Sequence, residues 1–291
     1  MKKFLIVWIL ILVGSTCYGW GFFGHSKINY HAVFLLPPEM LVLYKPQIEY
    51  LSAHAADPDK RRYVLKEEGP RHYIDLDHYG AYPFDSLPRK WDDAVARYTE
   101  DSLKQHGTVP WWIEVCYRRL VHAFREKDKA RILKLSADIG HYLADAHVPL
   151  HTSSNHNGQH TGQRGIHGFW ESRVPELLAD AEWDFFVGKA SYISNPLQFA
   201  WDRVLESAAA VDSVLHYEKE LTQNFPEDRK YAFENRNGMV VRQYSTAFCR
   251  AYNELLHGMI ERRMRQSIFA VASYWYSAWV DAGQPDLEEL S

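Results

Sequence analysis

The chain is organised around one histidine-rich helical segment, Asp138-Ile-Gly-His141-Tyr-Leu-Ala-Asp145-Ala-His147-Val-Pro149-Leu-His151. Its apolar residues recur at three- and four-residue spacing, which is typical of an amphipathic helix. His141 and Asp145 are four residues apart, so both side chains lie on one face of that helix. Pro149 should end the helix near His147, which lets His151 turn toward a different site.

A second pair with the same spacing, His167 and Glu171, follows a segment from His151 onward that is rich in Ser, Asn, Gly, Gln and His. This composition predicts an irregular loop. One histidine and one carboxylate at this spacing can equally form a simple hydrogen bond on a helix surface. Two pairs joined by a histidine-rich loop favour metal binding, because His151, His167 and Glu171 would leave positions open for water, as in a catalytic zinc site.

Helical periodicity also dominates the rest of the chain. It predicts helices over residues 92–106, 110–125, 128–146, 196–221 and 238–280. Residues 48–77 show no clean alternation and predict loops with short helical pieces, and strand signals are weak throughout. No Pro/Gly/Ser-rich linker divides the chain, so we expect a single all-α domain over residues 20–291.

Residues 1–19 have the pattern of a secretory signal peptide. Lys2 and Lys3 precede an apolar run over residues 4–13, and small residues follow up to Gly19. A bilayer-spanning helix needs about twenty apolar residues, so this run predicts a cleaved signal and export to the periplasm or the exterior. Lipidation of Cys17 is the alternative, although Gly14 fits poorly the branched residue that usually precedes such a cysteine.

The charge and the cysteine content bear on two classes of function, nucleic-acid binding and metal binding by thiolates. Removing Lys2 and Lys3 leaves 31 of the 33 basic residues against 37 acidic ones, a formal charge of −6. This net charge is not the basic one typical of nucleic-acid-binding proteins. Cys116 and Cys249 could form a disulfide or remain two buried thiols. Neither belongs to a Cys-x-x-Cys motif, so metal chemistry must rest on the histidines, of which there are fifteen, and on carboxylates.

Cleavage after Gly19 would expose the α-amino group of Trp20. This amine and the first carbonyl can chelate one metal ion together, with His25 completing the site. Trp20 could instead be only an anchoring aromatic residue.

Taken in order, these residues resemble the zinc-dependent phospholipase C and single-strand-specific nuclease superfamily. The matching positions are Trp20, His25, Asp57, His72, His141, Asp145, His151, His167 and Glu171. The resemblance covers residues 20–171, about half of the chain, and implies an all-helical domain with a trinuclear metal cleft that holds three zinc ions. Beyond Glu171 no motif matches.

The resemblance implies a ligand set for each ion. The first zinc would be held by Asp57, His72, His141 and Asp145, the second by His151, His167 and Glu171, and the third by Trp20, His25 and Asp145. Asp145 would bridge two ions, and Asp57 and Asp145 would be the catalytic carboxylates. Hydroxide shared between two zinc ions would then attack phosphorus in line.

Two phosphodiester substrates are compatible with the resemblance. Glu171 as the last ligand is similar to the phospholipases, and the acidic net charge favours a lipid or small diester. Tyr73 and Asp75 are similar to the residues with which the nucleases hold a base of DNA, RNA or a 3'-nucleotide, and Lys60 occupies the position of a phosphate-binding arginine. A secreted zinc-binding protein without catalysis is the third alternative, and it predicts a site sealed by residues 153–165. We expect a monomer with no obligate protein partner.

Overall fold

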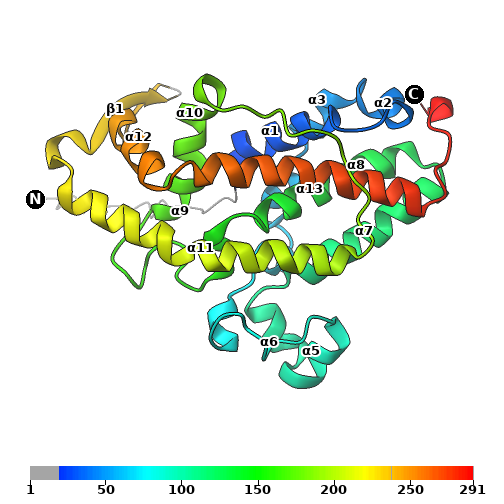
Figure 1. Cartoon of the computed structure of the whole chain (residues 1–291), viewed down its shortest axis with the longest axis horizontal. Coiled ribbons are helices and arrows are strands. Elements are labelled where there is room, and N and C mark those ends of the chain that lie inside the picture. The colour runs from blue at the N-terminus through cyan, green and yellow to red at the C-terminus, as the bar shows by residue number, and fades with distance from the viewer. Residues whose placement is uncertain (1–19, 237, 291) are drawn as a thin grey trace, which may run out of the picture.

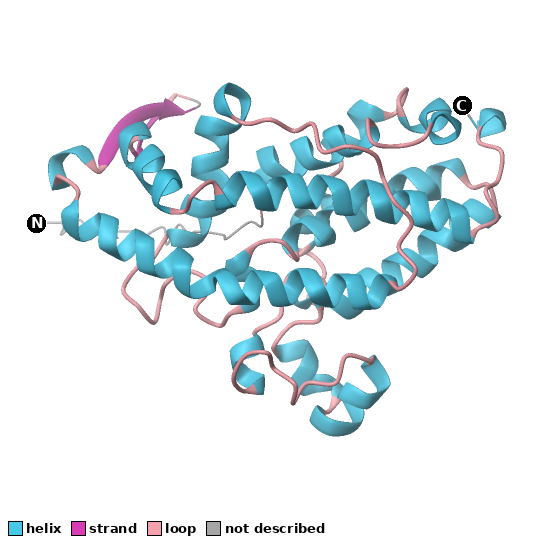
Figure 2. Ribbon diagram, viewed as in Figure 1, coloured by secondary structure: helices cyan, strands magenta, loops and turns pink. Residues whose placement is uncertain are grey.

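The computed structural model describes residues 20–236 and 238–290, and these residues are mostly helical (Figures 1 and 2). The predicted signal peptide and the lipidation of Cys17 concern residues 1–19, which lie outside the described part. Among the helices that are described, none is both long enough and apolar enough to cross a bilayer.

Long helices lie side by side along the longest axis of the molecule (Figure 1). They are α7 (Val109–Arg125), α8 (Lys129–Asp145), α11 (Pro196–Asn224) and α13 (Met259–Asp281), with α1 (Gly21–Val33) packed against α8 and α13. Helix α8 is buried along its whole second half, from Ser136 onward. The Trp275 ring of α13 is fully buried and its Nε1 donates to the Ser136 carbonyl at 3.0 Å, which holds α13 onto α8.

Short helices lie in the connections between the long ones and after α13. They are α2 (Pro38–Tyr44), α3 (Ile48–Ala53), α4 (Asp57–Arg61), η1 (Gly69–His72), η2 (Leu76–Tyr79), η3 (Pro149–Thr152), α9 (Ile166–Gly168), the π-helical turn η4 (Phe169–Arg173), α10 (Val174–Glu182), η5 (Glu227–Arg229) and η6 (Glu288–Leu290). The prediction of short helical pieces over residues 48–77 is confirmed. So is the irregular segment between His151 and His167, which holds little more than η3 and the start of α9.

The predicted helices over 110–125, 128–146 and 196–221 are confirmed by α7, α8 and α11. The helix predicted over 92–106 is two helices, α5 (Trp91–Tyr98) and α6 (Glu100–Gln105), which project from the long helices (Figure 1). The break falls at Thr99, whose φ of 67° and ψ of 150° are far from helical values and end the helix. The Thr99 hydroxyl then caps α6 by accepting from the Ser102 amide.

The helix predicted over 238–280 is wrong at its start. Residues from Met239 form a strand, β2 (Met239–Tyr244), which pairs antiparallel with β1 (Tyr231–Arg236), and helices α12 (Thr246–Leu255) and α13 follow. Arg236 pairs with Met239, so two residues, Asn-Gly in the sequence, connect the strands. This dipeptide is the strongest short-range signal for a hairpin turn, and it outweighs the apolar spacing of Met239–Tyr244.

Cys116 on α7 and Cys249 on α12 are both buried free thiols. The alternative of a disulfide between them is therefore excluded. Burial raises the pKa of the Cys116 thiol above its usual range and that of Cys249 to about 12, so neither is a reactive thiolate.

Candidate metal centre

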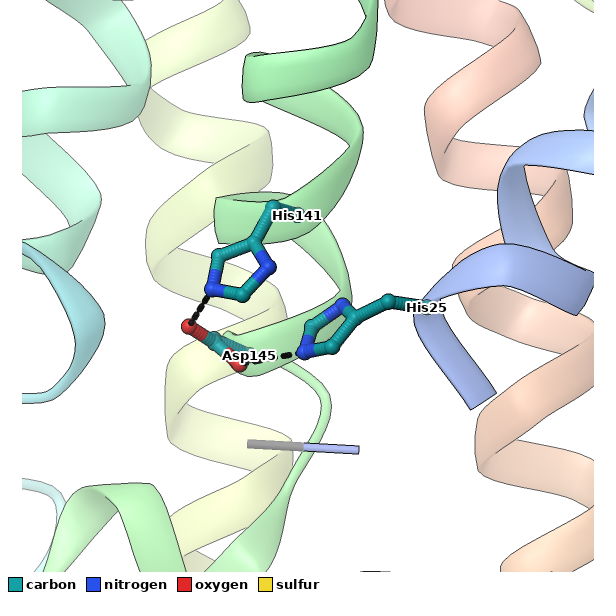
Figure 3. A group of neighbouring side chains, drawn as sticks. All are labelled: His25, His141 and Asp145. Atoms are coloured by element: carbon teal, nitrogen blue, oxygen red, sulfur yellow. Dashed lines mark ion pairs between the residues drawn. The ribbon is translucent and has the colours of Figure 1, made fainter. Parts of the chain in front are cut away.

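The C-terminal end of α8 carries the first group of candidate ligands. His141 and Asp145 are fully buried, and the His141 Nε2 atom lies 3.2 Å from Asp145 Oδ2. His25 reaches the same carboxylate from α1, with its Nε2 atom 3.4 Å from Asp145 Oδ1 (Figure 3). The predicted one-face arrangement of His141 and Asp145 is confirmed, and a third residue distant in sequence joins it.

Close packing of α1 on α8 brings His25 into place. At Gly140 an added Cβ would lie 2.0 Å from Asn29 Oδ1, so only glycine permits this approach. The buried Asn29 amide donates to the Leu51 and Ala137 carbonyls, each at 3.2 Å, and thereby ties α1 to α3 and α8. The ligand helices are thus joined one turn away from the metal centre.

The second group consists of His141, His72 on η1 and Asp59 on α4. The His72 Nδ1 and His141 Nε2 atoms are 2.9 Å apart, and they lie 3.8 and 3.9 Å from Asp59 Oδ1. Asp59 is fully buried. Its carboxylate therefore faces two imidazoles inside the protein.

The third group is His151 on η3 with His167 and Glu171 at α9 and η4. The Nε2 atoms of His151 and His167 are 3.1 Å apart, and Glu171 Oε2 lies 3.5 Å from the first and 2.8 Å from the second. The structure thus brings together the three residues that the sequence predicts as one zinc site.

Asp145 connects the three groups through its two carboxylate oxygens. Oδ2 lies 2.9 Å from His72 Nδ1 and 3.2 Å from His141 Nε2. Oδ1 faces the other way, 3.4 Å from His25 Nε2 and 3.8 Å from His151 Nδ1. A carboxylate whose oxygens face different sets of imidazoles has the geometry that a bridge between two ions requires.

Backbone carbonyls fix the orientation of three of the histidines. The Nδ1–H groups of His141, His151 and His167 donate to the carbonyls of Ala55, His72 and His156 at 2.9, 2.6 and 3.0 Å. Each ring therefore presents a bare Nε2 atom to the cluster. Such outer hydrogen bonds are a regular feature of metal-ligating histidines.

Two of the distances within the groups are close to the separation of ligands on one zinc ion. Two ligands at the usual zinc distance of about 2.0–2.1 Å in a tetrahedral arrangement are about 3.3 Å apart. The separations of 3.1 Å between His151 and His167 and of 3.2 Å between His141 and Asp145 are close to this value. Imidazole and carboxylate ligands without cysteine are also a usual zinc ligand set.

Buried polar atoms without partners provide an independent test of the fit. Among the described residues, those with no hydrogen-bond partner include His25 Nδ1 and Nε2, His72 Nε2, Asp145 Oδ1 and both carboxylate oxygens of Asp59 and Glu171. An unsatisfied buried polar atom costs about 1–3 kcal/mol and a charged one more, so a fold rarely concentrates them. Cations would satisfy the carboxylates, and the residues present therefore fit a cluster of metal ions.

Without cations, burial of these ligands also makes their charged forms unfavourable. Burial raises the pKa of Glu171 to about 8 and lowers the pKa of His25 and of His167 to about 4. Burial also opposes ionisation of Asp145, but His141 and His151 outweigh it and hold the pKa of Asp145 well below its usual range. Burial thus opposes the charged forms of Glu171, His25 and His167, and a bound cation would stabilise the ionised form of Glu171.

Asp57 is not a member of the cluster, and its prediction as a ligand and catalytic residue is corrected. Its carboxylate accepts from Lys60 Nζ at 2.8 Å and contacts His54 Nδ1 at 2.5 Å, at the surface. Asp59 takes the predicted place instead. Residues two apart on a helix point about 200° from each other, so only one of the two can face His72 and His141.

The prediction of Lys60 as the phosphate-binding residue is also corrected. It pairs with Asp57 at the surface, whereas Arg62 lines a pocket of about 210 Å³ that opens onto the cluster. The pocket is lined by Arg62, His72, Tyr73, Asp75, Leu150, His151, His156 and His167. The sequence contained a signal for Arg62. In the nuclease pattern an arginine follows the Asp ligand by three residues, and Arg62 follows Asp59 by three.

Tyr73 and Asp75 both lie in this pocket, as the sequence predicts for substrate contacts. The Tyr73 hydroxyl donates to the Gln105 carbonyl at 3.3 Å, which fixes the ring at the pocket wall. Burial and the neighbouring Asp77 raise the pKa of Asp75 to about 7. His156, from the loop, also lines the pocket.

Trp20 stands immediately before α1 and is fully buried. Its Nε1 donates to the Ala144 carbonyl at 2.8 Å, and its ring packs against Trp170 with centroids 5.1 Å apart. The start of the predicted mature chain is therefore anchored at the residue that precedes Asp145.

Comparison with profiles of known protein families and with curated protein sequences gives no match to this chain.

Proposed function

We propose that this protein is an exported zinc-dependent hydrolase of phosphate diesters, of the phospholipase C type. One observation carries the proposal: three groups of buried His, Asp and Glu residues adjoin one another through contacts of Asp145, beside a pocket that Arg62 lines. Diester hydrolysis needs several positive charges on one phosphate, and clustered metal sites are a common means of supplying them. The helical architecture agrees with the resemblance of residues 20–171 to the zinc phospholipases and nucleases.

The residues that would hold zinc are His25, Asp59, His72, His141, Asp145, His151, His167 and Glu171, together with the α-amino group of Trp20. When bound, zinc supplies Lewis acidity, which makes water nucleophilic near neutral pH and offsets charge that develops on phosphate oxygens. Burial of the ligands keeps bulk water out of the cluster and strengthens every electrostatic interaction within it.

Arg62 is the residue best placed to bind a non-reacting phosphate oxygen. Its guanidinium lies at the pocket wall, and its NH1 atom is 3.8 Å from Asp59 Oδ1, a contact that holds the side chain toward the cluster. Guanidinium groups bind phosphate oxygens through paired hydrogen bonds. Tyr73 and Asp75 would contact the part of the substrate beyond the phosphate, where an aromatic ring beside a carboxylate suits a choline head group.

A single-strand nuclease is the second candidate, and Arg62 is the observation that favours it. This arginine stands three residues after Asp59, the spacing of the nuclease pattern, and Tyr73 and Asp75 lie in the same pocket. A base stacked on Tyr73 would gain about 1–3 kcal/mol, and the Asp75 carboxylate could accept hydrogen bonds from its edge.

A zinc-binding protein without catalysis is the third candidate. It requires residues 153–165 to seal the metal centre. The pocket of about 210 Å³ reaches His72, His151 and His167. A substrate could therefore reach the cluster, which favours an enzyme over a sealed zinc-binding protein.

Metal content and hydrolysis test the proposal directly. The mature protein should contain about three zinc ions and hydrolyse bis(p-nitrophenyl) phosphate, and a chelator should abolish this activity until zinc is restored. Chelation should also lower Tm by about 10 °C or more. Each ion present at about 100 times its Kd stabilises the folded protein by ~2.7 kcal/mol, and this stabilisation is lost when the ion is removed. Protein that binds no metal and hydrolyses equally well with chelator would refute the proposal.

The substrate is identified by comparing three reactions of the zinc-loaded enzyme. These are release of phosphocholine from phosphatidylcholine vesicles, cleavage of single-stranded DNA and cleavage of RNA. A hundredfold difference in kcat/KM, ~2.7 kcal/mol, in favour of the vesicles supports the phospholipase, and the reverse supports the nuclease.

The start of the chain provides a second test. A chain that begins at Trp20 should bind one more zinc ion, or bind its last ion at least about tenfold more tightly, than a chain with one alanine added before Trp20. The reason is that an amide nitrogen is a poor metal ligand whereas a free α-amine is a good one. Zinc content by elemental analysis and activity are the measurements, and equal melting temperatures of the zinc-free forms serve as the control. Identical zinc content and activity would exclude the terminal amine as a ligand.

A further inference from the structure

A second cluster of ligating side chains lies at the edge of the pocket, outside the proposed trinuclear centre. Asp75 and His78 belong to the turn at η2, and His106 follows α6. One ligand atom from each of the three side chains lies within 4.8 Å of the others. Asp75 also lines the pocket, so this cluster adjoins the cleft through one residue.

The backbone holds these residues together independently of any ion. The Asp75 amide donates to the His106 carbonyl at 2.7 Å, and the His78 amide donates to the Asp75 carbonyl at 3.2 Å. The rings of His78 and His106 stack with centroids 3.7 Å apart and an interplanar angle of 30°. The turn and the stacking therefore keep these residues adjacent without an ion, and a metal would only have to draw their ligand atoms together.

The charges around the cluster favour a cation. The neighbouring Asp77 carboxylate accepts from the amide and the hydroxyl of Ser154, which keeps it beside Asp75. Burial and His78 lower the pKa of His106, so its imidazole is neutral near pH 7, as a metal ligand must be. Asp75 itself has a raised pKa because it is half-buried beside Asp77.

We propose that Asp75, His78 and His106 form a fourth metal site at the mouth of the cleft, for a divalent transition ion such as Zn²⁺ or Cu²⁺. Two imidazoles and one carboxylate are a ligand set for these ions, with further positions left to water. His78 is exposed and Asp75 and His106 are partly so, unlike the buried cluster. The ion at this site therefore exchanges with the solution.

Metal titration of the mature protein tests the site. Protein freed of loosely bound ions by gel filtration is titrated with Zn²⁺ in a calorimeter. We expect one additional ion per chain, and His78→Gln and His106→Gln should each weaken its binding by about tenfold or more. His216→Gln is the matched control, because His216 is an exposed histidine on α11 that pairs with Glu220 and should leave the titration unchanged.

Electron paramagnetic resonance of Cu²⁺ added to the zinc-loaded protein gives a second readout. The spectrum should show two coordinated imidazole nitrogens, with one lost in each of the two variants. No additional ion, or binding and spectra that His78→Gln and His106→Gln leave unchanged, would overturn the proposal. Tightly bound zinc is counted separately in every variant, so failure of this site is distinguishable from failure of the trinuclear centre.

Discussion

Replacement of Asp59 by Asn should reduce phosphodiester hydrolysis by about 1000-fold or more, which corresponds to ~4 kcal/mol of lost transition-state stabilisation. Asp59 is fully buried, neither of its carboxylate oxygens has a hydrogen-bond partner, and it faces His72 and His141. An amide has nearly the same shape but no charge, so one metal ion loses its anionic ligand. We expect the zinc content to fall by about one ion per chain.

Asp57→Asn is the matched control for this prediction. Asp57 lies two residues away on the same short helix, but its carboxylate binds Lys60 and His54 at the surface. Its loss should cost at most about 1 kcal/mol of stability and leave zinc content and kcat/KM within about twofold. A larger loss of activity in Asp57→Asn than in Asp59→Asn would mean that Asp57 is the ligand after all.

Replacement of Asp145 by Asn should have the largest effect of any single change, because one carboxylate serves more than one metal group. Its two oxygens lie within 2.9–3.8 Å of ring nitrogens of His25, His72, His141 and His151. We expect the loss of at least two zinc ions and an activity below about one thousandth of the original. Elemental analysis and hydrolysis of bis(p-nitrophenyl) phosphate are the measurements.

Asp138→Asn serves as the control on the same helix. Asp138 lies two turns earlier on α8 and pairs with Arg61 at 2.9 Å and Lys134 at 2.7 Å, away from the histidines. This variant should lose stability but keep its zinc content. If Asp145→Asn retains three zinc ions, Asp145 does not bridge, and the three groups must bind their ions independently.

Local features of the metal centre could be predicted because they depend on a single element. In a helix, residues four apart lie on one face, and the separations of 3.2 Å for His141 and Asp145 and of 2.8 Å for His167 and Glu171 follow from this rule. The long helices α7, α8 and α11 could be predicted in the same way, from apolar residues at helical spacing.

The errors of prediction arose where the local pattern allowed two outcomes. Asp57 and Asp59 have the same chemistry and lie in one short helix. At residues 239–244 the apolar spacing suited a helix, but these residues pair with Tyr231–Arg236 as a strand, in agreement with the Asn-Gly dipeptide that precedes them in the sequence. Thr99 interrupted a further helix through its own backbone conformation.

The sequence by itself determined the ligand types, the two histidine–carboxylate pairs and the helical class, since helix periodicity fixes distances between residues close in the chain. Only the tertiary structure decided that Asp59 rather than Asp57 faces His72, that Arg62 rather than Lys60 lines the pocket, and that Asp75, His78 and His106 meet at its mouth. These choices depend on which side of each short element is buried. Burial is set by the packing of α1, α8 and the connecting segments against one another, and no single segment contains that information.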